Sequence, residues 1–415
     1  MKRPLLAGVA CATLVMSAAI AAPASAHGRD DRPPITVGDP VTIAEGLLTP
    51  LSLDVNRRGT AFVSQDFAGL LTEVGRDGTM SEFASAGTPG NSIGAVSTRH
   101  GRVYFAEVSP DHSYAMLKKV TRYGVRDVAD LQQHEETVNP DQVNTYGFVG
   151  INESDPECAA QIDPEAEPFL PAEYTGLVDT NPYASFATRG GVYVADAGAN
   201  AILRAKYDGT VSTVAVLPPI GPFVVNAEVA QQAGFPECVA GKEYYFEPVP
   251  TDVEQGPDGW LYVTTLPGGP EDPSLGARGA VYKVHPYKGT VELVAGGFVS
   301  PTGLAVSKKS GTIYVAELFG GENGSGQISV LAPGADAPTP LVAASLPAAI
   351  ELRHGKLWVT TDTTVFGEQG PEAVGKIVTY QLSRGGGHGY GSHGSGDSES
   401  YSDTDAPAPE ESTGE

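Results

Sequence analysis

Polar and apolar residues alternate over short runs along most of this chain, and six of these runs end in the same order of residue types. The order is an aromatic residue, an apolar or β-branched residue, a small residue and a polar one. Alternation with a period of two is typical of β-strands, whose successive side chains point to opposite faces. The six copies are Phe62–Gln65, Tyr104–Glu107, Tyr193–Asp196, Tyr262–Thr265, Tyr314–Glu317 and Trp358–Thr361.

The spacing of these runs indicates a repeat architecture. Successive aromatic residues are separated by 42, 89, 69, 52 and 44 residues. Two of these steps match the roughly 40–50 residues of one propeller blade, and the other three match one blade plus an insertion. The sequence therefore predicts an all-β fold, a six-bladed β-propeller.

Turn signals divide each unit into four strands. A glycine follows the first strand of each unit, as in His100-Gly101 and Asp258-Gly259, and another separates the third strand from the fourth, as in Asp77-Gly78 and Asp208-Gly209. Asp-Gly between two β runs favours a tight hairpin, because such turns need positive φ. We therefore expect four-stranded blades.

The sixth unit is one strand short. Residues 348–352, Lys356–Thr361 and Lys376–Leu382 supply three strands, and the chain then enters a glycine run. An apolar run near the N-terminus, Val41–Ala44, is the available fourth strand. Pairing the two ends closes the ring and removes exposed strand edges.

Two insertions interrupt the repeat, at 139–180 and 218–249. Both connect an outer strand to the next inner strand, so we expect them on one face of the propeller, where functional loops are common. They are rich in aromatic residues, which line a binding cleft or pack the loops onto their own domain. Each contains one cysteine, Cys158 or Cys238, and we expect these to form a disulfide.

The ends of the chain predict export. Residues 1–26 have a basic start, an apolar stretch and a small-x-small cleavage site, which is typical of a secretory signal peptide. The mature domain then spans 27–383, and 384–415 is a Gly/Ser/His-rich acidic tail that we expect to be disordered. A secreted monomer without a membrane span is the resulting expectation.

Composition and net charge exclude some classes of binding partner. The 415 residues include 41% hydrophobic ones, enough for a substantial core, and the net charge is −24. So acidic a protein repels nucleic acid and anionic lipid, which leaves an unknown small molecule or an extracellular protein as the partner.

The third to fifth units carry a family resemblance. The stretch Asn181–Tyr183, the run Val192–Arg204 and the segment Val249–Asp252 resemble the ScyD/ScyE family, and the second of these also resembles the NHL repeat. The resemblance implies an exported six-bladed propeller. It does not supply a reaction, because the activity of the family is not settled.

Two sets of residues are candidates for chemistry. Three carboxylates close the second strands, namely Glu107, Asp196 and Glu317. They either accept hydrogen bonds from neighbouring backbone amides or gather oxygen ligands for Ca²⁺ or another divalent cation. Residues that open the inner strands are expected to line the channel mouth and to bind a ligand there. They include Asn91, Asn181, Thr251 and Thr302.

No catalytic residue stands out. The chain lacks the H-E-x-x-H motif of zinc hydrolases. We therefore predict a non-catalytic exported propeller without an assigned cofactor, which binds a ligand or partner on the face of the insertions. The alternative is a metal-dependent lactonase or related hydrolase of the gluconolactonase-like propeller type.

Overall fold

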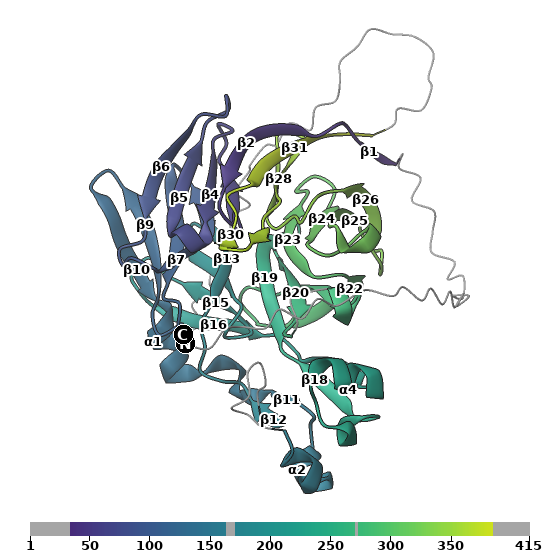
Figure 1. The fold of residues 1–415 in the computed structure, drawn as a ribbon. Coiled ribbons are helices and arrows are strands. Elements are labelled where there is room, and N and C mark those ends of the chain that lie inside the picture. The colour runs from purple at the N-terminus through teal and green to yellow at the C-terminus, as the bar shows by residue number, and fades with distance from the viewer. Residues whose placement is uncertain (1–33, 163–170, 270–272, 385–415) are drawn as a thin grey trace, which may run out of the picture.

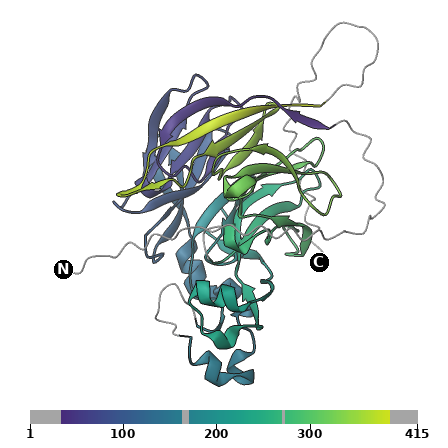
Figure 2. The same ribbon diagram turned by 45° about the vertical axis from the view of Figure 1, so that its right-hand side comes forward.

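Five four-stranded antiparallel sheets and one five-stranded sheet are arranged around a central axis, and a further four-stranded sheet projects from one side (Figures 1 and 2). The computed structural model describes residues 34–162, 171–269 and 273–384. The predicted signal peptide at 1–26 and nearly all of the predicted tail lie outside the described residues. The predicted all-β six-bladed propeller is confirmed.

The first three blades use consecutive strands, each antiparallel to the next. Blade 1 consists of β3 (Leu53–Val55), β4 (Ala61–Gln65), β5 (Leu70–Val74) and β6 (Met80–Ser85). Blade 2 consists of β7 (Ser92–Arg99), β8 (Arg102–Val108), β9 (Ala115–Thr121) and β10 (Gly124–Asp130). Blade 3 consists of β13 (Pro182–Thr188), β14 (Gly191–Asp196), β15 (Ala201–Ala205) and β16 (Val211–Val216).

The fourth and fifth blades follow the same order. Blade 4 consists of β19 (Pro248–Gln255), β20 (Leu261–Pro267), β21 (Gly279–Val284) and β22 (Val291–Phe298). Blade 5 consists of β23 (Pro301–Val306), β24 (Ile313–Glu317), β25 (Gln327–Leu331) and β26 (Thr339–Ala343). A two-stranded ribbon, β29 (Phe366–Gly367) with β30 (Gly370–Pro371), lies within the blade 6 sequence.

Blade 6 closes the ring with the N-terminal strand, as predicted. It contains β27 (Ile350–Arg353), β28 (Lys356–Thr361) and β31 (Gly375–Arg384). The fourth strand is β2 (Val41–Leu47), which pairs antiparallel with the first half of β31. A further strand, β1 (Ile35–Val37), pairs with the end of β31, so this strand continues one residue into the segment predicted as tail.

The repeated aromatic residues explain why the blades pack. Each lies on the second strand of its blade and contacts the hydrophobic side chains of the following blade. Tyr104 of blade 2, for example, packs with Val192 and Val194 of blade 3, and Tyr193 in turn packs with Val263 of blade 4. Burial of such a side chain contributes roughly 1.5–3 kcal/mol. The aromatic residue of each motif therefore lies in the interface between neighbouring blades.

The turn glycines adopt the conformation that their positions require. Gly78, Gly209 and Gly289 in the outer hairpins have φ of 82°, 96° and 65°. L-residues with a Cβ rarely adopt these values, whereas glycine does so without a steric cost. These glycines therefore fix where each third strand turns into the fourth.

The remaining elements connect blades 2, 3 and 4. The first connection holds α1 (Leu131–Val138), a 3-10 helix at Pro140–Val143, β11 (Thr145–Gly147), α2 (Ile151–Ser154), α3 (Pro156–Ala159) and β12 (Glu173–Thr175). The second holds β17 (Ile220–Val224), α4 (Ala227–Ala233), a 3-10 helix at Glu237–Val239 and β18 (Glu243–Phe246). Short 3-10 helices also occur at Asp66–Ala68, Pro273–Leu275 and Glu322–Gly324.

Candidate functional site

The central channel is lined by the inner strands of all six blades. The space left for water inside it is about 10 Å³, room for about one water molecule. Its lining includes Ser52, Val96, Ser185, Asp252, Thr302 and Glu351, one from each blade in order. The channel is therefore largely filled by side chains.

Polar side chains of the inner strands join one blade to the next. Asp252 Oδ2 accepts a hydrogen bond from the amide of Leu304 at 2.7 Å, which links blade 4 to blade 5. The hydroxyl of Thr302 in blade 5 donates a hydrogen bond at 3.1 Å to the carbonyl of Ala348, which lies just before the first strand of blade 6. Arg353 Nε then donates to the carbonyl of Val55 in blade 1 at 2.8 Å. These hydrogen bonds link blades 4, 5, 6 and 1 in sequence.

The pKa values of several carboxyl groups in the channel are raised above their ordinary values. Burial, followed by the charge of Glu254, raises the pKa of Asp252 to about 8. Burial also raises the pKa of Glu254 to about 7, against the opposing effect of Lys308 and Arg353. The pKa of Glu351 is raised as well, mainly by burial, although Arg353 Nη1 lies 3.2 Å from its carboxylate. Carboxyls of this kind are candidates for acid–base chemistry, but they also occur in structural networks.

The three carboxylates that close second strands fasten the chain entering their own blade. Glu107 accepts hydrogen bonds from the amides of Gly87 and Thr88, both at 3.0 Å. Glu317 accepts one from the amide of Val299 at 2.6 Å. Gln65 does the same for Leu48 in blade 1, at 2.9 Å. In blades 1, 2 and 5, these side chains therefore hold the segment before the inner strand in an equivalent way.

Asp196, the third of these carboxylates, belongs to a larger group. Its oxygens accept hydrogen bonds from the amide of Asn181 at 2.7 Å and from the hydroxyl of Thr180 at 2.6 Å. Burial raises the pKa of Asp196 to about 6, and these hydrogen bonds lower it in part. Glu107 and Glu317 lie in other blades, so the structure does not bring the three together.

The four residues predicted at the channel mouth have separate surroundings. Asn91 donates its amide to Glu107 at 2.9 Å, and Asn181 is engaged with Asp196 through its backbone. Thr251 donates to the carbonyl of Pro301 at 2.7 Å. Thr302, which bonds across to blade 6, is the one of the four that lines the channel cavity. These four residues thus form hydrogen bonds within a blade or between neighbouring blades.

The two insertions fold together into one module, which is defined here as residues 144–162, 171–175 and 220–246. Strands β12, β11, β18 and β17 form a single sheet in that order, with β11 from the first insertion pairing with β18 from the second. The predicted disulfide Cys158–Cys238 is confirmed and joins them covalently, with a Cα–Cα distance of 5.8 Å. Figure 2 shows the module projecting below the propeller.

The aromatic residues of the insertions form the core of this module. Phe148 is 1% exposed and contacts the rings of Phe235 and Tyr244 at centroid distances of 5.3 and 5.0 Å. Tyr244 in turn lies 4.8 Å from Phe246. They pack on each other, so the described aromatic residues do not line an open cleft. Phe169, another aromatic residue of the first insertion, lies outside the described residues.

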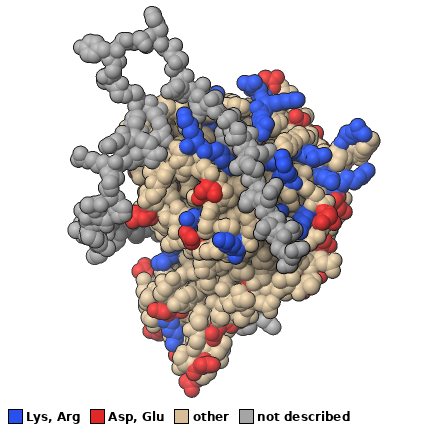
Figure 3. All heavy atoms as spheres, turned by 180° about the vertical axis from the view of Figure 1, so that it is seen from behind, with Lys and Arg blue, Asp and Glu red and all other residues tan. Residues whose placement is uncertain are grey.

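The surface of the module is acidic. The two insertions, 139–180 and 218–249, contain thirteen Asp and Glu residues and one basic residue, Lys242, and within the module as defined the count is seven to one. Figure 3 shows mainly acidic side chains on the projecting part and basic ones gathered over the propeller on that face. The module thus differs in charge from the blades that carry it.

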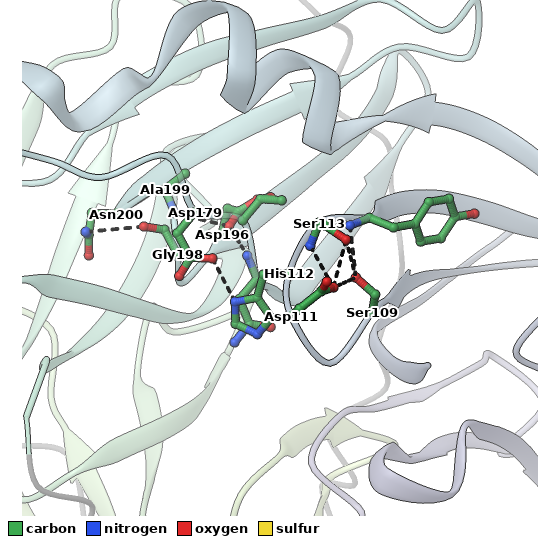
Figure 4. Close-up of polar contacts among 12 residues, drawn as sticks. Ser109, Asp111, His112, Ser113, Asp179, Asp196, Gly198, Ala199 and Asn200 are labelled. Carbon is green, nitrogen blue, oxygen red and sulfur yellow. Dashed lines mark hydrogen bonds and ion pairs between the residues drawn. The ribbon is translucent and has the colours of Figure 1, made fainter. Parts of the chain in front are cut away.

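A histidine–aspartate pair lies on the same face of the propeller as the insertions (Figure 4). His112, in the turn between β8 and β9, places Nδ1 2.7 Å from Asp179 Oδ1. This hydrogen bond is the main cause that raises the pKa of His112, and the charges of Asp179 and Asp196 contribute. Both side chains are more than one third exposed, so the pair is accessible to solvent.

Sequence reasoning missed His112 and Asp252. Neither lies in a motif, and their partners, Asp179 and Leu304, are 67 and 52 residues away in the chain. The alternation of the inner strand β19 was the available signal, because Asp252 and Glu254 are two residues apart and share a face.

A second, shallow cavity of about 380 Å³ lies between blades 3 and 4, with Arg204, Tyr287 and Lys288 in its lining. It adjoins the outer hairpin of blade 4, and so lies on the face opposite the insertions. Among the described residues, no group of three or more His, Cys, Asp or Glu side chains is arranged to hold a metal ion. In that same part of the chain, no helix is long and apolar enough to cross a membrane.

Comparison with known proteins supports the fold. No protein-family model and no curated protein matches the chain. The PQQ-bound aldose sugar dehydrogenase from Streptomyces coelicolor is similar in structure, with a TM-score of 0.52 and 15% identity over 85% of this chain and 100% of that one. At this identity the likeness concerns the fold alone.

Two further solved structures align less closely. A putative glucose dehydrogenase from Thermus thermophilus has a TM-score of 0.48 and 14% identity over 83% of this chain and 99% of that one. A gluconolactonase from Xanthomonas campestris has a TM-score of 0.46 and 10% identity, over 85% and 96% of the two chains.

Proposed function

We propose that this protein is an exported, non-catalytic β-propeller that binds an extracellular protein partner through the acidic module. The observation that carries the proposal is the contrast between two regions. The channel is filled and its polar groups join the blades, whereas the insertions form a separate, covalently closed and acidic projection. A partner with a basic contact surface matches this charge.

Export is part of the proposal. A disulfide is typical of proteins from oxidising compartments, and the sequence of residues 1–26 predicts the signal peptide. Membership of the ScyD/ScyE family is likewise a proposal, based on the residues of blades 3 to 5.

Neutralising the module surface tests the proposal. The variant Glu153→Gln/Glu228→Gln/Glu237→Gln removes three exposed charges from the module. The control variant, E82Q/D336N/E368Q, removes three exposed charges from the propeller. The three proteins are immobilised and exposed to culture medium of the source organism at low and high salt, and the captured proteins are purified and titrated individually.

The expected result is the capture of one basic protein, whose affinity for the wild type falls at high salt. The module variant should bind this protein at least tenfold more weakly, and the control variant should bind it as the wild type does, because charges at the rim of an interface act through salt-dependent association. Equal binding by both variants, or no saturable partner, would contradict the proposal.

The second candidate function is a metal-dependent lactonase or related hydrolase acting in the channel. It is favoured by the channel carboxyls of Asp252 and Glu254, whose pKa values are raised into the range useful for proton transfer. A lactone-hydrolysis screen with and without chelator tests it. Turnover that disappears in Asp252→Asn and with chelator would establish this function instead of the first.

A further inference from the structure

Several buried oxygen atoms have no hydrogen-bond donor in the region where α1 and the first insertion meet blade 3. Neither carboxylate oxygen of Glu135 makes a hydrogen bond of normal geometry, and the same holds for Asp141 Oδ1, Asn139 Oδ1 and Asn200 Oδ1. Glu135 and Asp141 are 0% exposed, and Asn200 is 1% exposed. Unsatisfied buried acceptors are costly, so their presence together calls for a positive partner.

The end of α1 brings the first three of these residues together. Glu135 and Asn139 are four residues apart and so lie on the same side of the helix. Asn139 ends the helix in the left-handed conformation, with φ of 39° and ψ of 77°. This sharp turn leads into the 3-10 helix that carries Asp141, which is itself buried. The local sequence therefore folds back so that Asp141 follows closely after the helix.

The asparagines use their nitrogens and leave their oxygens unpaired. Asn200, from the turn between β14 and β15, donates Nδ2 to Asp141 Oδ2 at 2.8 Å. Asn139 donates Nδ2 to the carbonyl of Gly176 at 2.9 Å. A Cβ on Gly176 would lie 1.9 Å from Asp141 Oδ1, so glycine is needed at this position to leave room for the carboxylate.

The surrounding charge is negative. The charges of Asp196, Asp141 and Asp179 act on the carboxyl group of Glu135. The charges of Asp141 and Asp179 also act on the carboxyl group of Glu247. Five carboxyl groups thus influence one another in a largely buried region.

We propose that this region holds a calcium site in which Glu135 and Asp141 supply carboxylate ligands and Asn139 and Asn200 supply amide oxygens. Hard oxygen donors of mixed charge are the ligands that Ca²⁺ prefers, and its coordination geometry is flexible. The ion would join α1, the start of the first insertion and blade 3, and so fasten to the propeller the segment that leads into the module. The site differs from the sequence-based hypothesis, which combined Asp196 with Glu107 and Glu317 from other blades.

Calcium binding to the mature protein tests the proposal. Protein treated with chelator and then desalted is titrated with Ca²⁺, and separately with Mg²⁺, by calorimetry and by thermal unfolding. We expect one saturable Ca²⁺ per chain and a rise in Tm of about 3 °C at 100 times the Kd. Tb³⁺ is a second probe, because the hydroxyl of Tyr146 lies 3.2 Å from Asp141 Oδ2, close enough to sensitise its emission.

Four variants separate this site from the acidic surface. Glu135→Gln, Asp141→Asn and Gly176→Ala should each weaken Ca²⁺ binding on the order of 100-fold. Glu136→Gln, the next residue on the same helix, is exposed and should bind like the wild type. Folding of every variant is checked by near-UV circular dichroism and by urea denaturation in chelator.

Two results would overturn the proposal. One is a wild-type protein that binds neither Ca²⁺ nor Tb³⁺ at millimolar concentration. The other is folded E135Q protein that binds both ions as tightly as E136Q protein. Stronger binding of Mg²⁺ than of Ca²⁺ would also refute the assignment of the ion. Because the readout is metal binding, its failure is distinct from a failure to find the protein partner.

Discussion

The pH dependence of stability offers a direct test of the channel carboxyls, with Asp252 as the decisive residue. In the unfolded chain its pKa is the ordinary 3.8, and in the folded protein it is about 8. The folded state therefore holds a proton that the unfolded state has released throughout this interval. It follows that this group stabilises the fold least at high pH, and that stability falls as pH rises from about 4 to about 8.

The magnitude follows from the same interval. The free energy of unfolding changes by about 1.4 kcal/mol for each pH unit in which one group is protonated only in the folded state. Between pH 5 and pH 7, Asp252 alone should therefore lower the stability of the wild-type protein by about 2–3 kcal/mol.

The substitution Asp252→Asn removes this titration and one hydrogen-bond acceptor. The two carboxyl oxygens accept hydrogen bonds from the amides of Val253 and Leu304, both at 2.7 Å, and the side chain of Asn has only one oxygen for such a bond. The variant should be less stable than the wild type by about 1–3 kcal/mol at pH 5. The difference should shrink or reverse by pH 8, where Asp252 of the wild type becomes charged.

Urea denaturation of both proteins at pH 5, 6, 7 and 8, with the disulfide intact, measures the two slopes. The variant Glu82→Gln, at an exposed position on β6, is the control and should follow the wild-type curve. Parallel pH profiles for D252N and the wild type would refute the reasoning, because they would show that Asp252 does not change its protonation on unfolding.

Three further predictions concern the module and the closure of the ring. Replacing Cys158 and Cys238 with serine opens a loop of 80 residues, and the chain-entropy model predicts a loss of about 4–5 kcal/mol, measurable by urea denaturation; a loss below 1 kcal/mol would contradict that model here. Phe148→Ala should cost about 3–5 kcal/mol, whereas Val143→Ala, at a 76% exposed position, should cost under about 0.5 kcal/mol. Deleting residues 34–47 removes β1 and β2, which cover the outer edge of β31, and size-exclusion chromatography should then show aggregation that a chain starting at residue 34 does not show.

The sequence alone determined the blades and their order. Alternating side chains, one aromatic residue per second strand and a glycine in each tight turn are local signals, and each is read within about ten residues. Even the closure by Val41–Ala44 followed from counting strands, because an unpaired strand edge is unfavourable. The disulfide could be predicted because the two mature cysteines lie in insertions at neighbouring junctions.

Tertiary structure alone decided which polar groups meet. Asp252 accepts a hydrogen bond from the amide of Leu304, and Asn200 donates one to Asp141, which is 59 residues away in the chain. The alternation of a strand tells which side chains share a face, but it does not tell which face meets which neighbour, or how far a side chain lies from water. Burial and charge therefore depend on the closed ring and the folded insertions, and so do the raised pKa values of Asp252 and Asp196, because desolvation arises only when distant segments pack together.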